Sequence, residues 1–241
     1  MREPRGLSSF QAPGCRPANE AAPLVLAQSL RRVFHQGGAD IVAVSDASCT
    51  IQPGDRIAIT GPSGSGKSTL LHLFAGLDQP SAGALSWPAL GPRESLRPTQ
   101  IGVSLQMPGL LPSLTVAENV ALPLLLSQAA PEQARAAARR ILEEQDLAAL
   151  ADKLPEELSG GQAQRVSLVR ALVAQPRLIL ADEPTGQLDH PTAQHMLDLL
   201  LATLGGSASA LVIATHDPSI AERLDRVWNM HQGALTGNTN P

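Results

Sequence analysis

The chain has 241 residues, 43% of them hydrophobic and only 2% aromatic, so its core must be built mainly from Leu, Val, Ile and Ala. This length suits one α/β domain or two small ones. A net charge of −4, with no Lys/Arg cluster beyond short pairs, argues against nucleic acid as a partner. Cys15 and Cys49 lack the spacing of a metal site, and we expect no structural disulfide.

Residues 1–23 are rich in Pro, Ala and Gly and are predicted to form a flexible tail, without the continuous apolar segment of a secretory signal. No later stretch approaches the roughly 18 apolar residues that read as a membrane-spanning helix. We therefore expect a soluble, cytoplasmic protein. Any role at a membrane then depends on a partner that spans it.

Short strands and helices alternate along the rest of the chain. In chain order, we expect strands over 24–34, 41–51 and 56–60, a helix over 67–75, mostly loop over 78–100, a strand over 101–105, helices over 131–150 and 160–174, a strand over 178–181, a helix over 191–204 and a strand over 210–215. This order predicts a mainly parallel sheet with helices on its faces.

The segment that joins the strand at 56–60 to the helix at 67–75 reads GPSGSGKS and matches G-x-x-x-x-G-K-[ST]. Small residues allow successive backbone N–H groups to converge on phosphate oxygens, and the helix N-terminus adds a partial positive charge. Lys67 is expected to reach the β- and γ-phosphates of a nucleotide, and the Ser68 hydroxyl to ligate Mg²⁺. The strand–loop–helix context predicts a phosphate-binding loop.

Two carboxylates end the apolar strand in LILADEP. Because side chains alternate along a strand, Asp182 and Glu183 cannot play one role. One can hold Mg²⁺ through its waters, while the other accepts a proton from an attacking water. By itself the pair also fits an ordinary surface turn; the phosphate-binding loop favours the catalytic interpretation. His216 ends the strand at 210–215, at the carboxyl edge where α/β sheets place their ligands.

The string LSGGQ opens the helix at 160–174. Ser159 and Gln162 fit a capping box, which is a purely structural explanation. Gly160 and Gly161 also leave bare amides at a helix N-terminus, an arrangement that suits close approach to an anion. Both interpretations hold together.

These motifs jointly resemble the nucleotide-binding domain of ABC (ATP-binding cassette) ATPases over roughly residues 24–235. The likeness rests on GPSGSGKS, a glutamine after a strand, LSGGQ, LILADEP, GQLD and THD. It implies an α/β fold of the P-loop NTPase class: a RecA-like core with a mainly parallel sheet, a small antiparallel β region and an inserted helical subdomain at approximately 107–163. The ATPase domain would span 24–241, after the tail.

The resemblance implies binding of ATP and Mg²⁺ in a head-to-tail dimer that encloses two ATP molecules. The residues implied to cradle the nucleotide are Gly61, Pro62, Ser63, Gly64, Ser65, Gly66, Lys67, Ser68 and Thr69. Metal contacts are implied for Ser68, Gln106 and Asp182. Among the catalytic residues, Glu183 would be the general base, His216 would contact the γ-phosphate, and Gln106 would also sense the partner.

The same resemblance assigns residues to the far side of the shared site. Those implied to face the ATP of the other subunit are Ser159, Gly160, Gly161 and Gln162. Asp189 would lie at the dimer seam. Phe34 matches the position of an aromatic that stacks on adenine, and a place in the core explains it equally well.

A narrower likeness lies in HLFAGLDQPSAG, MPGLLPSLTVAENVALPLLL and LADEPTGQLD, which resemble the branch of lipoprotein-releasing, macrolide- and peptide-exporting, and cell-division ATPases. In that branch the membrane subunit docks after Gln106. The apolar residues there would form a socket for it or pack the helical subdomain: Leu110, Leu111, Pro112 and Leu114. Two departures stand out, because Gln187 replaces the usual Asn and the stretch between Gly83 and Gln106 is short.

The implied function is the ATP-binding and ATP-hydrolysing subunit of an ABC transporter, pairing with itself or with a second ABC ATPase to drive a transmembrane permease. It would be peripheral at the inner face of the cell membrane through that permease. The alternative is a regulatory ABC ATPase of the cell-division type, which acts on a membrane partner without transport and carries identical motifs. We expect no nucleic-acid partner, and no segment predicts the cargo.

Overall fold

The computed structural model describes residues 22–239, so Cys15 and most of the predicted tail at 1–23 lie outside the described residues. The strands are β1 (Val25–Gln36), β2 (Ala39–Ile51), β3 (Arg56–Thr60), β4 (Ala82–Ser86), β5 (Ile101–Ser104), β6 (Leu178–Asp182), β7 (Ala210–Ala214), β8 (Arg226–His231) and β9 (Ala234–Thr239). The α-helices are α1 (Lys67–Phe74), α2 (Val116–Leu126), α3 (Pro131–Glu144), α4 (Gly160–Leu172), α5 (His190–Leu204) and α6 (Pro218–Ala221). Three short 3₁₀ helices are η1 (Arg93–Ser95), η2 (Ala148–Leu150) and η3 (Pro155–Glu157).

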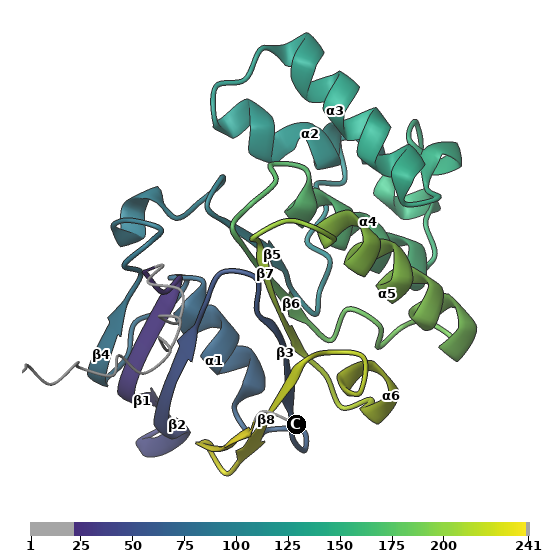
Figure 1. Ribbon diagram of the computed structural model, residues 1–241. Coiled ribbons are helices and arrows are strands. Elements are labelled where there is room, and N and C mark those ends of the chain that lie inside the picture. Colours follow the sequence, from purple (N-terminus) through teal and green to yellow (C-terminus); the bar gives the residue numbers. More distant parts are fainter. Residues whose placement is uncertain (1–21, 240–241) are drawn as a thin grey trace, which may run out of the picture.

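Within the described residues, the strands follow one another in the order β4-β1-β2-β9-β8-β3-β7-β6-β5. The central strands β8, β3, β7, β6 and β5 are parallel, whereas β4, β1 and β2 form an antiparallel region at one end. A single residue pair, Asp46 with Ala234, joins β2 to β9. Figure 1 shows these two parts side by side. The expected P-loop α/β fold, with a mainly parallel sheet and a small antiparallel region, is confirmed.

The buried strands divide their side chains between two hydrophobic clusters. In β3, Ile57 and Ile59 belong to the cluster under α1, while Ala58 faces the cluster under the other helices. The same alternation runs through β6 and β7, whose residues are fully buried. Alternation on two covered faces is what a parallel sheet between helical layers requires. It leaves the carboxyl ends of the central strands as the place where polar side chains can gather.

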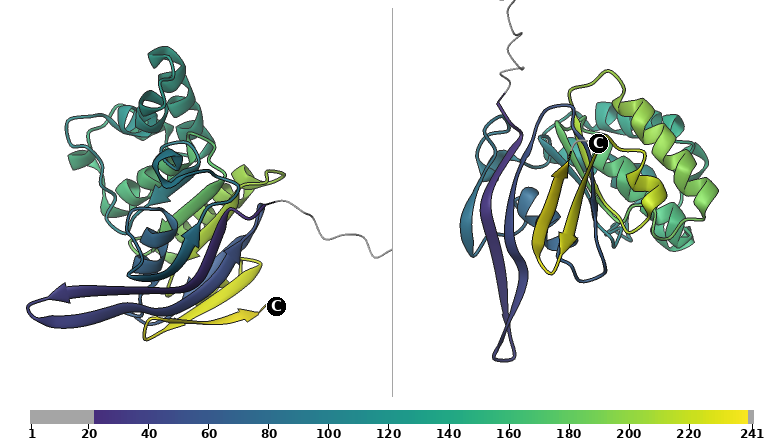
Figure 2. Two further views of the ribbon diagram at one scale, coloured as in Figure 1. Left: turned by 90° about the vertical axis from the view of Figure 1, so that its left-hand side faces the viewer. Right: turned by 60° about the horizontal axis from the view of Figure 1, so that its bottom comes forward.

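Helices cover the two faces unequally. The short α1 covers one face, packing Phe74 edge-on against Trp228 at 6.4 Å between ring centroids. The helices α2 to α5 lie on the other side, with α2 and α3 farthest from β1 and β2 in Figure 1. Their apolar side chains join those of the sheet in one cluster. The β1–β2 hairpin extends away from the rest of the molecule in both views of Figure 2.

Several elements differ from the sequence-based expectation. The stretch 78–100 is not only loop, because it contains η1 and also the strand β4, which pairs with β1. The helix expected over 131–150 ends at Glu144, since Asp146 takes a left-handed conformation with φ +54° and Leu147 N donates back to Leu142 O at 2.7 Å. An aspartate tolerates that conformation better than most residues. The last turn becomes the separate η2.

The sequence analysis also missed α2, β8, β9 and the one-turn α6. Helix α2 is apolar nearly all round and contains Pro123, so it shows no helical periodicity. Its start carries a readable signal, because Thr115 and Glu118 form a complete capping box. Of the helices described, none is both long and apolar enough to cross a membrane.

Candidate active site

The loop between β3 and α1 requires glycine at two positions of close backbone approach. Gly61 has φ +149° and Gly66 φ +103°, both in the region that side chains disfavour. A Cβ on Gly61 would lie 2.2 Å from Met230 O, and one on Gly66 would lie 2.1 Å from Ala43 O. Loop 61–66 therefore packs closely between β2 and β8.

Lys67 lies across this loop. Its Nζ donates to Gly61 O at 2.8 Å and to Pro62 O at 3.2 Å, and it lies 3.9 Å from Glu183 Oε1. Only 7% of the lysine is exposed. A buried ammonium held by carbonyls and one carboxylate is placed to exchange those partners for phosphate oxygens.

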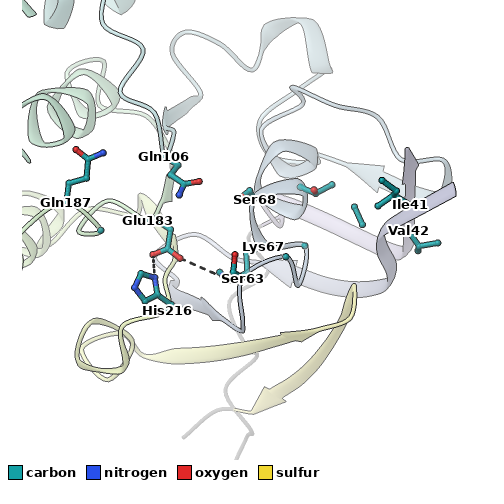
Figure 3. A pocket seen from close by; sticks show the side chains of 14 residues that line it. Ile41, Val42, Ser63, Lys67, Ser68, Gln106, Glu183, Gln187 and His216 are labelled. Atoms are coloured by element: carbon teal, nitrogen blue, oxygen red, sulfur yellow. Dashed lines mark hydrogen bonds and ion pairs between the residues drawn. The ribbon is translucent and has the colours of Figure 1, made fainter. Parts of the chain in front are cut away.

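Glu183 directly follows β6 and is held from two sides. Its Oε2 lies 2.8 Å from His216 Nδ1, and its backbone N–H donates to Ala214 O at 2.9 Å. Its φ of +48° is left-handed, which is strained for a glutamate and recurs at functional sites. The carboxylate projects into the same space as Lys67, as Figure 3 shows. A general base oriented by a histidine matches this geometry.

Asp182 is 3% exposed, and its Oδ1 finds no hydrogen-bond partner among the described protein atoms. Burial raises the pKa of its carboxyl, a hydrogen bond with the Ser68 side chain opposes the rise, and the negative charge of Glu183 adds to it. A desolvated carboxylate beside a hydroxyl is an incomplete set of hard oxygen donors, and such a set fits Mg²⁺. No cluster of three or more His, Cys, Asp or Glu suited to a metal occurs in the part of the chain described.

Lys67, Ser68, Glu183 and His216 share one cleft of about 630 Å³, and Asp182 is buried behind Glu183 outside its lining. Its lining combines the phosphate-binding loop, the ends of β5, β6 and β7, and the β1–β2 hairpin: Ile41, Val42, Ala43, Ser63, Gly64, Gly66, Lys67, Ser68, Thr69, Gln106, Glu183, Gly186, Gln187 and His216. Figure 3 shows Gln106 above Glu183, with Ile41 and Val42 on the opposite side of the cleft. The sequence analysis did not assign Ile41, Val42 or Gly186 to this site.

Phe34 does not line the cleft. Its ring packs against the guanidinium of Arg32, with 4.4 Å between the guanidinium carbon and the ring centroid, and it is 37% exposed. In the hairpin register Phe34 lies directly opposite Ile41, which does line the cleft. Cross-strand partners share one face, so Phe34 is next to the cleft wall rather than inside it.

The LSGGQ segment lies at a separate surface hollow. Ser159 and Gln162 form the predicted capping box, with Gln162 N donating to Ser159 Oγ at 3.2 Å and Ser159 N donating to Gln162 Oε1 at 3.0 Å. Asp189 also lines this hollow and caps α5, accepting from Thr192 N at 2.9 Å. That hydrogen bond is the main reason why the pKa of Asp189 is lowered. Within one chain, LSGGQ and the phosphate-binding loop do not meet.

Gln187 is the residue common to both places, because it lines the cleft and the LSGGQ hollow. Its Oε1 occupies the space beside Gly160, where a Cβ would lie 2.2 Å away. A larger residue at position 160 would therefore displace the Gln187 side chain, which also lines the cleft.

Two further residues shape the segment after Gln106 and were missed from the sequence. Asn119, fully buried on α2, donates to the carbonyls of Leu111, Leu114 and Thr115 and accepts from Leu111 N, at 2.7–3.1 Å. Arg170 on α4 donates to the carbonyls of Pro108 and Gly109 at 2.7 and 2.8 Å. No sequence pattern singled out either residue.

A glycine loop before a helix N-terminus, a lysine among its carbonyls and two carboxylates at the end of the neighbouring strand define a P-loop nucleotide hydrolase. The ABC transporter family matches residues 44–186, more than half of the chain, and the chain belongs to this family. It is an ATP-binding and ATP-hydrolysing subunit of an ABC transporter.

The chain is similar in sequence to curated relatives along nearly their whole length. A lipoprotein-releasing system ATP-binding protein, LolD, of Bordetella pertussis is 45% identical over 90% of this chain and 97% of its own. The protein of the same name from Legionella pneumophila is 44% identical over 88% and 96%. These relatives confirm the likeness to the lipoprotein-release branch, and the regulatory, non-transport alternative is not favoured.

Solved structures of the same family also superpose on this chain. Two dimeric structures of the ATP-binding cassette MJ0796, one in a post-hydrolysis state bound to ADP and Pi, superpose with TM-scores of 0.82 and 0.83. Each is 31% identical and covers 90% of this chain and all of its own.

Proposed function

We propose that this chain supplies the ATP-driven motion by which a membrane permease releases lipoproteins from a membrane. The observation that carries the choice of cargo is 45% identity to a lipoprotein-releasing system ATP-binding protein over 97% of that relative. The described part of the chain has no helix able to cross a bilayer, so such work requires a membrane-spanning partner. We place the chain at the inner face of the cell membrane, attached through that partner.

In the proposed site, the backbone of 61–69 and Lys67 hold the phosphates of ATP. Ser68 and Asp182 hold Mg²⁺, with Gln106 at the same end of the cleft; the bound ion neutralises charge on the phosphates. The orphaned, buried Oδ1 of Asp182 supports this assignment. Glu183 takes a proton from the attacking water, and His216 holds the Glu183 carboxylate in place at 2.8 Å and contacts the γ-phosphate.

The far wall of the site comes from a second copy in this proposal. Ser159, Gly160, Gly161 and Gln162 offer a helix N-terminus at a surface that cannot reach the cleft of their own chain. A head-to-tail homodimer places each LSGGQ against the other copy's ATP, with Asp189 at the seam. ATP then becomes part of the interface, and its hydrolysis loosens the dimer.

The segment after Gln106 is the proposed docking surface for the permease. Three apolar side chains of residues 107–126 are exposed: Met107 is 81% exposed, Leu111 46% and Leu126 72%. Leu110 instead packs against the core cluster, and Leu114 is half-buried, so the apolar socket predicted from the sequence is only partly open. Asn119 and Arg170 hold the loop rigid, which lowers the entropy cost of binding a coupling segment.

Reconstitution tests the function directly. The chain and the permease subunits of a lipoprotein-releasing system are placed in proteoliposomes that contain a lipid-anchored lipoprotein. We expect ATP to release the lipoprotein to a soluble fraction, and ATP with the Glu183→Gln chain to release none. Full ATPase activity without release of any lipoprotein offered would contradict the proposed cargo.

A second measurement addresses docking. Leu111→Asp places a charge on the proposed surface and is expected to abolish co-purification with the permease while leaving the ATPase activity of the isolated chain intact. Ala202→Asp adds the same charge at an exposed position of α5 and serves as the control. Unchanged co-purification of the Leu111→Asp chain would remove this surface from the proposal.

A further inference from the structure

Few hydrogen bonds join α4 to the end of β5. Gln164, on α4, is 1% exposed, and its Nε2 donates to Leu105 O at 3.3 Å. Leu105 directly precedes Gln106, which lines the cleft. One buried side chain therefore connects the helix that begins at the LSGGQ glycines to the backbone that carries Gln106.

The other end of this amide has no partner. Gln164 Oε1 is buried without a hydrogen bond to any described protein atom. Exchanging the oxygen and nitrogen would not help, because Oε1 would then face the Leu105 carbonyl. The only polar side-chain contact beside it in the described chain, Ser104 Oγ to Ser167 Oγ, is also long at 3.4 Å.

The contact between the neighbouring α2 and the loop that follows Met107 is hydrogen-bonded more completely. Asn119 makes four hydrogen bonds of 2.7–3.1 Å to the loop that follows Met107. That loop is fixed to α2 through Asn119 and to α4 through Arg170, which donates to the carbonyls of Pro108 and Gly109 at 2.7 and 2.8 Å, whereas the backbone at Leu105 is fixed to α4 by one long bond. Two other side-chain atoms without a hydrogen-bond partner among the described residues are Ser65 Oγ, in the phosphate-binding loop, and Asp182 Oδ1, at the end of β6. Like Gln164, both belong to segments that the proposed function assigns to ATP.

A packing role alone does not account for Gln164. A methionine has similar length and fills the same space without an orphaned acceptor, whose burial is destabilising. What the glutamine adds is the bond to the Leu105 carbonyl. Gly160 and Gln164 lie four residues apart on α4, so they share one face of the helix.

We propose that Gln164 is a positioning residue, which carries a displacement of α4 at the LSGGQ glycines to Gln106 through the Leu105 carbonyl. Phosphate held by the partner contacts the start of α4, α4 shifts, and the backbone at Leu105 and Gln106 follows because Gln164 holds the Leu105 carbonyl. The orphaned Oε1 gains a backbone N–H of the 105–107 segment when the loop has moved. This inference rests on the roles proposed above for Gly160 and Gln106.

Gln164→Met in the full chain tests the inference by steady-state ATP hydrolysis and thermal unfolding. We expect kcat to fall about tenfold. KM for ATP should stay within about twofold of the value for the unmodified chain, since the phosphate-binding loop that holds ATP is intact. The melting temperature should stay the same or rise, because an orphaned buried acceptor is removed. Gln164→Leu provides the same test if the methionine variant does not fold.

Gln145→Met is the matched control, because Gln145 is also a buried glutamine but donates to Thr203 Oγ1 at 2.8 Å, away from the cleft. It should lower the melting temperature and leave kcat unchanged. Unchanged kcat in Gln164→Met, or a fall in kcat and melting temperature that Gln145→Met reproduces, would overturn the inference. Gln106→Ala distinguishes a failure of the proposed function from a failure of this inference. If Gln106→Ala keeps full turnover, the proposed role of Gln106 fails. If Gln106→Ala loses turnover and Gln164→Met does not, only the role of Gln164 fails.

Discussion

The phosphate-binding cleft and the LSGGQ hollow are built in opposite ways. The cleft lies where several strand ends meet, and its Lys67 is only 7% exposed. The hollow lies between the starts of α4 and α5, and its Ser159, Gly160 and Gln162 are half-buried or exposed. In the proposed dimer the cleft binds the nucleotide, whereas the hollow offers a few amides to a phosphate held by the other copy. The difference explains how binding and turnover can be separated in this chain.

The largest expected effect comes from the cleft. Glu183→Gln should reduce single-turnover ATP hydrolysis by about 10²–10⁴-fold, because it removes the general base while keeping the shape of the side chain. ATP binding should persist and the dimer should accumulate, which size-exclusion chromatography with ATP measures. Normal turnover in this variant would remove Glu183 as the base.

The next largest effect is expected at the LSGGQ hollow. Gly160→Asp places a side chain where Gln187 Oε1 leaves only 2.2 Å and adds negative charge at the helix N-terminus. Turnover should fall by about 10²-fold, as for loss of a donor to transition-state charge. The affinity of a single chain for ATP, measured by fluorescent-nucleotide titration, should stay within about twofold of the unmodified chain.

Lys67→Ala gives the reciprocal pattern, with ATP affinity lost and the hollow intact. Mixing Lys67→Ala with Gly160→Asp chains should restore one complete site per heterodimer. If the mixture forms no ATP-dependent dimer, the two regions do not share a nucleotide.

A smaller effect is expected at the cleft wall. If Phe34 leaves Arg32 and stacks on adenine when ATP binds, Phe34→Ala should raise KM for ATP about 3–10-fold with kcat unchanged, as expected for loss of one aromatic stacking contact of about 0.5–1.5 kcal/mol. Phe34→Trp should keep the KM of the unmodified chain. If Ile41→Ala raises KM and Phe34→Ala does not, the wall is made by the residues that line the cleft, and Phe34 serves only to pack against Arg32.

The smallest effect concerns stability. Because burial raises the pKa of Asp182, the folded chain holds that proton more tightly than the unfolded chain. The stability therefore falls as pH rises from the ordinary aspartate range through the raised pKa, and the loss is complete at higher pH.

Asp182→Asn, without nucleotide or metal, should thus raise the melting temperature by about 2–4 °C, or about 1 kcal/mol. The gain should vanish at a pH below the ordinary aspartate pKa. Asp46→Asn, at an exposed position, should change nothing. An equal gain at all pH values would show that the charge of Asp182 is not the cause.

Much of the fold was predictable where the signal lies in adjacent residues. The strand at Arg56–Thr60, the helix after Gly66 and the capping box at Ser159 appear as expected, because turn chemistry and alternation depend only on neighbours along the chain. The helix α2 was missed because apolar residues lie on nearly all of its sides, so it shows no helical periodicity, and because Pro123 is unusual inside a helix. The strand β4 was missed because it has exposed, ordinary residues and exists through pairing with β1.

By itself, the sequence determined the phosphate-binding loop, the paired carboxylates and the LSGGQ cap, since each is a contiguous motif whose chemistry depends on the spacing of a few residues. Only the tertiary structure decided that Ile41 and Val42 face the cleft, that Gln187 borders both halves of the site, and that Gln164 holds Leu105. The physical reason is that strand order and helix packing bring together residues distant in sequence, and no local pattern records which of them will touch.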